Sequence, residues 1–318
     1  MPHASNLLTA MNFRTDATVP EPALAHAGGC HCPLHARRLF GAALLGAAAL
    51  PALGQPIEEC RRSKFTQLVS AEQLETAAGQ QYRQMLSQAS EQRAVGPKDH
   101  PQVVRLRAIA QRIIPFAIEC NERAKDWRWE VNLIGSKQLN AFCMPGGKIA
   151  FYYGILQQLQ LDDDEVAMIM GHEISHALLE HARERVGKTT ATRGVIELGS
   201  ALLGLGNTGR MFADLGGQLL TLRFSREDES QADALGLVIA ARAGYNPRAG
   251  ITLWQKMLSS NKGAPPQWLS THPSGESRIQ EMEARMARVQ PLYAAAPKPT
   301  ERFAPPPLKS ERRASENG

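Results

Sequence analysis

The sequence predicts a mainly helical α+β domain that contains one small β-hairpin or sheet. Most of the chain has apolar residues at helical spacing, and only two short segments alternate as strands do. Of the 318 residues, 43% are hydrophobic and 21% are charged, and the formal net charge is +5. These values are ordinary for a globular protein, and they exclude a wholly disordered chain and a dedicated nucleic-acid binder.

The N-terminal region has the features of an export signal. An apolar run at 39–53 follows Arg37 and Arg38 and ends beside Gly54. The run is shorter than the roughly 20 residues of a membrane span, which favours cleavage near Gly54 over a permanent anchor. The paired arginines resemble a twin-arginine signal, with the Sec route and a second start at Met11 left open.

The C-terminal residues differ in composition from the body of the chain. From residue 294 onward the sequence is rich in Pro and charge and poor in apolar residues, which is typical of a disordered tail. We therefore divide the chain into an export signal at 1–54, one folded domain at 55–293 and a Pro-rich tail at 294–318.

The cysteines agree with an exported protein. Cys30 and Cys32 lie in the predicted signal, so we interpret them as part of a removed segment rather than a metal clip. Among Cys60, Cys120 and Cys143, one disulfide is compatible with an oxidising compartment, and Cys60–Cys120 is the preferred pair. Sequence alone does not fix the connectivity.

Two helices open the folded domain. Residues 70–91 have apolar positions at helical spacing, and Ser70 with Gln73 forms a capping-box signal at their start. A second helix is predicted over residues 102–123.

The next segments have the period of strands. Residues 127–134 alternate between apolar and polar side chains, and residues 148–153, rich in apolar and aromatic side chains, indicate a second strand. The turn-rich residues between them predict a small hairpin or edge element.

The rest of the domain is helical in character. Residues 193–222 are apolar, but Glu197, Arg210 and Asp214 interrupt them at intervals too short for a membrane span. We interpret this run as one or two helices that pack against the domain or cover its cleft.

The helix predicted over residues 161–186 contains the sequence HEISH. Asp162 and Glu165 form a capping signal at its start. His172 and His176 are four residues apart, so both imidazoles project from one side of the helix, as two ligands of one zinc ion do. Glu173 could then reach a metal-bound water as a general base. The alternative is a surface helix whose histidines face solvent.

A catalytic zinc ion needs a third protein ligand, and the sequence does not supply it in the metzincin pattern. The metzincin pattern requires Gly and His at positions that are Leu179 and Ala182 here. His181 misses the register by one residue and is expected to point away or lie beside the ligands.

A later helix supplies another route. Glu229 and Asp233 are one turn apart on the helix predicted over residues 225–242. Glu229 would complete a His, His, Glu set, and Asp233 would accept a hydrogen bond from a ligating imidazole. Glu227 and Asp228 are local competitors, which we explain as exposed acids at a helix N-terminus.

Four sequence blocks together resemble the HtpX, OMA-type and CAAX prenyl protease family of zinc metallopeptidases (peptidase family M48), most of all its soluble, exported bacterial branch. The blocks are NAFCMPGGKIAFYYGIL, GHEISHALLEHARER, SREDESQADALG and STHPSGESRI, and the likeness covers residues 70–289. It implies a gluzincin-type fold, one Zn²⁺ bound by His172, His176 and Glu229, and Glu173 as the base. Neither flanking membrane helices nor a helical repeat domain is expected, so no docking partner is inferred.

The resemblance also implies a strand beside the cleft. An extended substrate would pair with it along Asn140, Ala141 and Phe142 and near Gly146 and Gly147. The alternative is a hairpin that only packs the core.

His272 lies in the loop that the family pattern brings close to the metal. It would either donate to the oxyanion of the reaction or bind the zinc as a fourth ligand and hold the site latent. The first role predicts that His272→Ala loses activity, the second that it gains activity. If His272 only packs the loop, His272→Ala would leave the activity unchanged.

Together these features predict an exported zinc metalloendopeptidase of the bacterial periplasm that cleaves unfolded or misassembled cell-envelope proteins. Peripheral association with a membrane and the oligomeric state are left open, and no nucleic-acid partner is expected. One alternative is a zinc-stabilised holdase that binds unfolded proteins without cutting them. Another is a membrane-anchored processing protease that retains residues 39–53.

Overall fold

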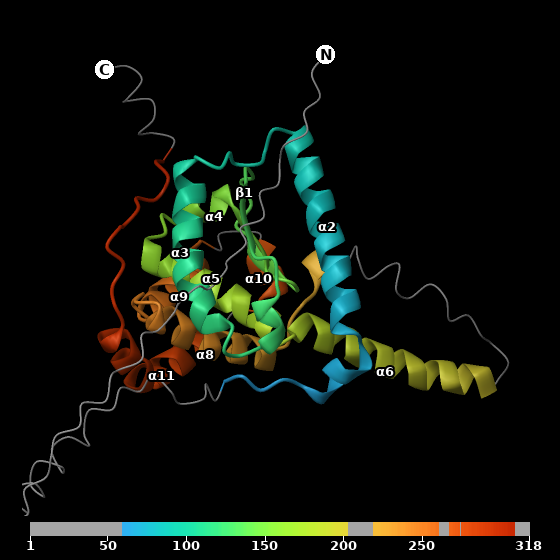
Figure 1. The fold of residues 1–318 in the computed structure, drawn as a ribbon. Coiled ribbons are helices and arrows are strands. Elements are labelled where there is room, and N and C mark those ends of the chain that lie inside the picture. The colour runs from blue at the N-terminus through green and yellow to red at the C-terminus, as the bar shows by residue number, and fades with distance from the viewer. Residues whose placement is uncertain (1–58, 203–218, 261–266, 274, 309–318) are drawn as a thin grey trace, which may run out of the picture. The chain divides into compact units, whose positions relative to one another are not determined.

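A computed structural model describes residues 59–202, 219–260, 267–273 and 275–308, all of which belong to one compact unit (Figure 1). The predicted signal at 1–54 lies outside these residues. Within the described ranges, no helix is both long and apolar enough to cross a bilayer.

The predicted mainly helical α+β class is confirmed. In chain order the elements are η1 (Lys64–Leu68), α2 (Ala71–Glu91), α3 (Pro101–Ala117), η2 (Glu122–Lys125), β1 (Glu130–Ile134), β2 (Ala141–Met144), β3 (Lys148–Tyr152), α4 (Tyr153–Gln158), α5 (Asp163–Leu178), α6 (His181–Leu202), η3 (Leu219–Thr221), α8 (Arg226–Arg242), α9 (Ala249–Ser259), α10 (Gln267–Thr271) and α11 (Glu276–Ala295).

The first two helices begin where the sequence predicts, but the second one is shorter. Ser70 caps α2 by accepting a hydrogen bond from the Gln73 backbone N–H. Helix α3 ends at Ala117 rather than near residue 123, soon after Pro115, which has no N–H to continue the helical ladder. The chain then turns, and Asn121 caps the short η2.

The sheet corrects the predicted hairpin. It has three strands in the order β1-β3-β2, with β1 parallel and β2 antiparallel to the central β3. Ala141–Met144 lies in the stretch that its turn residues assigned to a connection, but it forms the edge strand β2, as the family resemblance implies; its four residues are apolar and largely buried. The turn is confined to the residues that follow, where Gly146 and Gly147 take positive φ angles.

The two faces of the sheet pack against different helices. From β3, Ala150 joins a cluster with Tyr82 of α2, whereas Ile149 and Phe151 join the main core with α3 and α5. The Tyr82 hydroxyl also donates to the Ile149 carbonyl over 2.6 Å. The sheet therefore lies between α2 and the helical core.

The backbones of helices α5 and α8 are in direct contact. The predicted capping box of Asp162 and Glu165 starts α5. A Cβ atom placed on Gly171 of α5 would lie 2.9 Å from the Gly236 carbonyl oxygen, and one placed on Gly236 would lie 2.8 Å from the His172 nitrogen. Two glycines thus permit the contact that brings the first turns of α8 beside the HEISH segment.

The helix predicted to run to residue 186 is broken. Helix α5 ends at Leu178, Glu180 has a φ of 59°, and α6 starts at His181. The Glu180 carboxylate accepts a hydrogen bond from Arg183 over 2.8 Å, which links the break to the new helix. Of the apolar run at 193–222, residues 193–202 belong to α6, and residues 203–218 lie outside the described ranges.

The preferred disulfide is present. Cys60 and Cys120 are bonded, with their Cα atoms 5.2 Å apart. Cys143 is buried and has no disulfide partner among the described residues.

The prediction of a disordered tail is wrong for residues 294–308. Helix α11 continues to Ala295, and the following residues lie along α3 and the start of α5 (Figure 1). Gln102 donates to the Ala304 carbonyl, and the Phe303 N–H donates to Asp163, both over 2.9 Å. Composition misses these bonds, because the polar side chains that hold the segment come from distant parts of the chain. Residues 309–318 lie outside the described ranges.

Candidate metal centre

The two histidines of α5 converge as their spacing predicts. The Nε2 atoms of His172 and His176 are 3.1 Å apart, and both side chains are buried. They lie on the side of α5 that meets α8 and the loop after α10.

Glu229 joins them from the first turn of α8. Its Oε2 lies 3.5 Å from His172 Nε2, and its Oε1 lies 3.5 Å from His176 Nε2. Glu227 is exposed, as expected, but Asp228 is buried. The expectation of an exposed Asp228 is wrong because its carboxylate accepts the Ser225 N–H in a capping box.

His272 completes the cluster. Its Nδ1 is 3.0 Å from Glu229 Oε1 and 3.3 Å from His172 Nε2. One donor atom from each of His172, His176, Glu229 and His272 lies within 4.8 Å of all the others. The structure thus brings together the three predicted ligands and the predicted fourth candidate.

The separations of these donor atoms fit a small divalent metal. For a tetrahedral zinc ion with ligands at about 2.0–2.1 Å, neighbouring ligand atoms are about 3.3 Å apart. The two Nε2 atoms and the Glu229 oxygens are 3.1–3.5 Å apart. Because each histidine engages another residue through Nδ1, both Nε2 lone pairs can face the same point.

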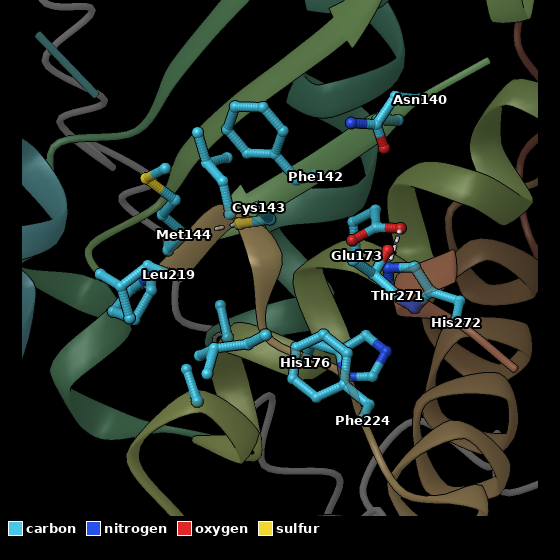
Figure 2. A pocket seen from close by; sticks show the side chains of 16 residues that line it. Asn140, Phe142, Cys143, Met144, Glu173, His176, Leu219, Phe224, Thr271 and His272 are labelled. Carbon is cyan, nitrogen blue, oxygen red and sulfur yellow. Dashed lines mark hydrogen bonds and ion pairs between the residues drawn. The ribbon is translucent and has the colours of Figure 1, made fainter. Parts of the chain in front are cut away.

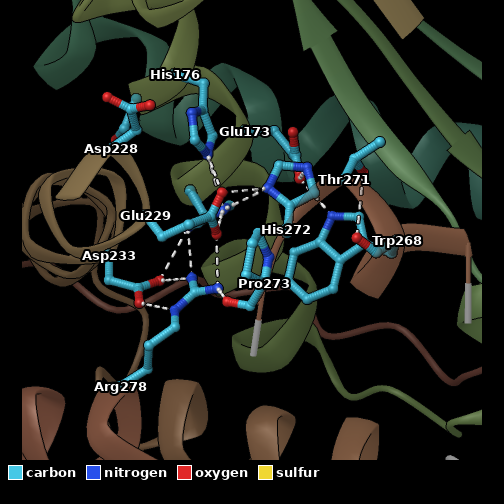
Figure 3. A network of polar contacts seen from close by, with 12 residues as sticks. Glu173, His176, Asp228, Glu229, Asp233, Trp268, Thr271, His272, Pro273 and Arg278 are labelled. Carbon is cyan, nitrogen blue, oxygen red and sulfur yellow. Dashed lines mark hydrogen bonds and ion pairs between the residues drawn. The ribbon is translucent and has the colours of Figure 1, made fainter. Parts of the chain in front are cut away.

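Arg278 of α11 holds two of the acidic side chains (Figure 3). Its guanidinium makes two hydrogen bonds of 2.6 Å to Asp233 and a third of 2.6 Å to Glu229 Oε2. Asp233 Oδ1 in turn lies 2.9 Å from His172 Nδ1, the contact predicted for it. The Arg278 guanidinium also lies over the Trp254 ring, 3.8 Å from its centroid.

Glu173 is placed at the edge of this cluster. The Trp268 indole N–H donates to its Oε1 over 2.6 Å, and His272 Nε2 is 3.5 Å from the same atom. Sequence reasoning missed both Arg278 and Trp268. The signal for Arg278 was the pair of acids itself, since two buried carboxylates require a buried cation.

Burial and neighbouring charges shift the basicity of the cluster in different directions. Burial, followed by the neighbouring histidines, lowers the pKa of His176 well below its ordinary value. Burial also opposes a charge on His272, but Glu173 and Glu229 outweigh it and raise the pKa of that side chain. For Glu229, the nearby His272, His172 and Arg278 outweigh burial and lower the pKa.

A cleft opens beside Glu173 and His176 (Figure 2). The edge strand, the end of α5, the start of α6 and the residues before α8 form its walls. The lining residues are Asn140, Ala141, Phe142, Cys143, Met144, Pro145, Glu173, His176, Ala177, Ala182, Leu219, Leu220, Leu222, Phe224, Thr271 and His272. Leu219 to Leu222 belong to the run expected to pack against the domain or cover the cleft, and their place in its wall agrees with that interpretation.

Three of the five residues predicted to contact substrate lie in this cleft. Asn140, Ala141 and Phe142 line it, but Gly146 and Gly147 do not. The two glycines form the turn after β2, where Gly146 lies near Glu75 and Gly147 lies against the Trp129 ring. Their positive φ angles serve the turn, which explains why these residue types are there without a substrate contact.

Comparisons with known proteins agree with this geometry. The model of "Peptidase family M48" matches residues 102–286. The Mitochondrial metalloendopeptidase OMA1 of Schizosaccharomyces pombe is 30% identical over 212 residues, which are 66% of this chain and 60% of that protein. The OMA1 of Arabidopsis thaliana is 37% identical over 152 residues, covering 47% of this chain and 30% of that protein.

A bacterial relative carries a different name. The Beta-barrel assembly-enhancing protease of Escherichia coli K12 is 30% identical over 170 residues, which are 50% of this chain and 35% of that protein. The match therefore spans between 30% and 60% of the length of these three relatives. The range matched by the family model contains all four residues of the metal cluster and Glu173.

Proposed function

Because this chain belongs to peptidase family M48, we propose that it is a zinc-dependent metalloendopeptidase that hydrolyses peptide bonds of unfolded or misassembled proteins. The observation that carries the proposal is the carboxylate of Glu173 at the rim of a buried His172, His176 and Glu229 cluster. A purely structural metal site needs no acid–base group at its rim, whereas a hydrolase does.

Each residue of the centre has a defined part in this reaction. His172, His176 and Glu229 would hold the ion, which when bound supplies a Lewis acid and lowers the pKa of a water at the open position. Trp268 donates to Oε1 of Glu173, so Oε2 is the atom left to accept the proton of the attacking water. Glu173 then returns that proton to the amine that leaves.

The cleft supports an extended substrate. Strand β2 is at the edge of the sheet, and its Ala141 and Phe142 line the cleft that contains Glu173. Backbone pairing along an edge strand reads little side-chain identity, which favours unfolded or exposed chain segments. The leucines and Phe224 on the opposite wall favour an apolar substrate side chain next to the bond that is cut.

We place the enzyme outside the cytoplasm, in the bacterial periplasm, with peripheral association with a membrane as part of the proposal. The export-like residues at 1–54 and the Cys60–Cys120 disulfide support this location, since disulfides persist in oxidising compartments. Cell-envelope proteins would then be the available substrates.

The test is cleavage of an unfolded model protein by residues 55–318, comparing the wild type with Glu173→Gln at equal zinc content. We expect cleavage by the wild type alone, and mass spectrometry of the products should place apolar residues next to the cut bonds. Cleavage by neither protein, with one zinc bound per chain, would favour the alternative of a zinc-stabilised binder or a latent site. Equal cleavage by both would contradict the proposed role of Glu173.

A further inference from the structure

We propose that His181 is a positioning residue that fixes the protonation of His176, so that His176 offers Nε2 to the metal. The proposal rests on the proposed zinc function of the His172, His176 and Glu229 cluster. Its basis is one contact: His181 Nδ1 lies 2.9 Å from His176 Nδ1, with both side chains buried.

A contact between two ring nitrogens at this distance holds a single proton. One nitrogen must donate and the other must accept, because a neutral imidazole carries one N–H. His176 Nε2 faces the donor cluster, 3.1 Å from His172 Nε2 and 3.5 Å from Glu229 Oε1. To bind a cation there, His176 Nε2 must keep its lone pair. The proton of His176 therefore resides on Nδ1, and His181 Nδ1 accepts the hydrogen bond from this N–H.

The surroundings of His181 favour the complementary form. With Nδ1 accepting, its proton resides on Nε2, which lies 3.4 Å from the Gln231 amide oxygen. A ring nitrogen of His181 and carboxylate oxygens of Glu184 and Asp228 also lie within 4.8 Å of one another. The Gln231 oxygen favours an N–H on the far side of the ring and leaves His181 Nδ1 free to accept a hydrogen bond from the His176 Nδ1–H.

His181, Glu184 and Asp228 are poor candidates for a second metal site. The Asp228 carboxylate is bonded to the Ser225 N–H over 2.8 Å, and Glu184 pairs with Lys188 at 2.5 Å. The lone pair of His181 Nδ1 is directed at His176. The group therefore serves the metal site nearby through His176 rather than holding an ion of its own.

The break between α5 and α6 makes this contact possible. In one continuous helix His181 would face away from His176, as the spacing suggests. The positive φ of Glu180 redirects the chain, and α6 begins at His181 with its ring against His176. The two ligands are thus oriented differently: His172 by the charged Asp233, and His176 by a neutral imidazole.

The experiment measures zinc affinity by competition with a chromophoric chelator, together with the visible spectrum of the cobalt-substituted protein. His181→Leu removes the acceptor and should weaken zinc binding about 10- to 100-fold, the usual effect of losing such a partner. His181→Asn is the matched rescue, because its amide oxygen occupies the place of Nδ1, and it should bind within about threefold of the wild type. His181→Gln places its amide nearer the position of Nε2 and should resemble His181→Leu.

The cobalt spectrum separates orientation from packing. The Leu variant should change the ligand-field bands, and the Asn variant should restore them. Wild-type affinity in His181→Leu, or equal loss in the Leu and Asn variants, would overturn the proposal. If His181→Leu fails to fold, the contrast between the Asn and Gln variants decides it in the same way. A wild type that binds no zinc would refute the proposed function itself, whereas zinc binding insensitive to His181 would refute this inference alone.

Discussion

The indole N–H of Trp268 donates to Oε1 of Glu173 over 2.6 Å, and this bond ties α10 to the side of α5 that faces the cleft (Figure 3). Trp268 is buried and its ring stacks on Trp254, so the donor has a fixed position. The bond leaves Oε2 of Glu173 to exchange a proton with the attacking water and the departing amine.

Trp268→Phe tests the value of that bond. The variant keeps an aromatic ring but removes the N–H, so Glu173 loses the contact that orients it. We expect kcat to fall about 10- to 100-fold with KM little changed, the scale associated with a misplaced catalytic group. Steady-state kinetics at equal zinc content provides the measurement, and an unchanged kcat would show that Glu173 is oriented by other contacts.

Glu229→Gln should abolish tight metal binding, because an amide oxygen replaces a charged ligand in a buried site. Glu227→Gln, two residues earlier on the exposed side of the same turn, is the matched control and should bind metal normally. Zinc content after dialysis against a weak chelator reports the difference. Normal zinc retention in both proteins would rule out Glu229 as a ligand.

Arg278→Met should destabilise the domain by about 3–5 kcal/mol, since it leaves the buried carboxylates of Glu229 and Asp233 without their cation. Bound zinc should recover part of this loss by neutralising Glu229. Arg285→Met on the same helix is the control and should change stability little. Urea unfolding without and with zinc measures the loss of stability and its recovery by the metal. Equal stability of the two variants would contradict the role assigned to Arg278.

His272→Ala should increase proteolysis. His272 Nδ1 lies among the donor atoms, 3.0 Å from Glu229 and 3.3 Å from His172, where it can fill the position that the attacking water needs. Initial rates on an unfolded substrate give the sign of the effect. A rate below that of the wild type would instead assign His272 to the oxyanion, and an unchanged rate would leave it only a packing role.

Breaking the disulfide should lower stability without changing the catalytic centre. Cys60→Ser with Cys120→Ser opens a loop with a sequence separation of 60 and should cost about 2–4 kcal/mol. Cys143→Ser is the control for the loss of a thiol. Thermal unfolding under oxidising and reducing conditions makes the comparison, and a wild type insensitive to reduction would argue against a contribution of this bond.

Several features of the fold and the site follow from local sequence. The capping box of Asp162 and Glu165 fixes the start of α5, and the spacing of His172 and His176 determines that both rings share one side of it. Glu229 and Asp233 could be identified for the same reason, because one turn of helix relates them. Such relations involve only neighbours along the chain.

Other features depended on partners distant in sequence. The edge strand β2 exists because β3 pairs with it, and the segment after α11 is ordered because Gln102 and Asp163 bind its backbone. The contact of His181 with His176 depends on the positive φ of Glu180, which spacing along a continuous helix does not reveal.

The sequence by itself thus determined the chemistry of this protein: two imidazoles and a carboxylate on one helix, and two more carboxylates on another. Only the tertiary structure decided how these groups meet. The close approach of Gly171 and Gly236 sets α8 against α5, and the loop after α10 and the first turn of α11 bring His272 and Arg278 to the same point. Packing of distant segments decides such convergence, because helical periodicity orients each side chain but does not select the neighbour that it will face.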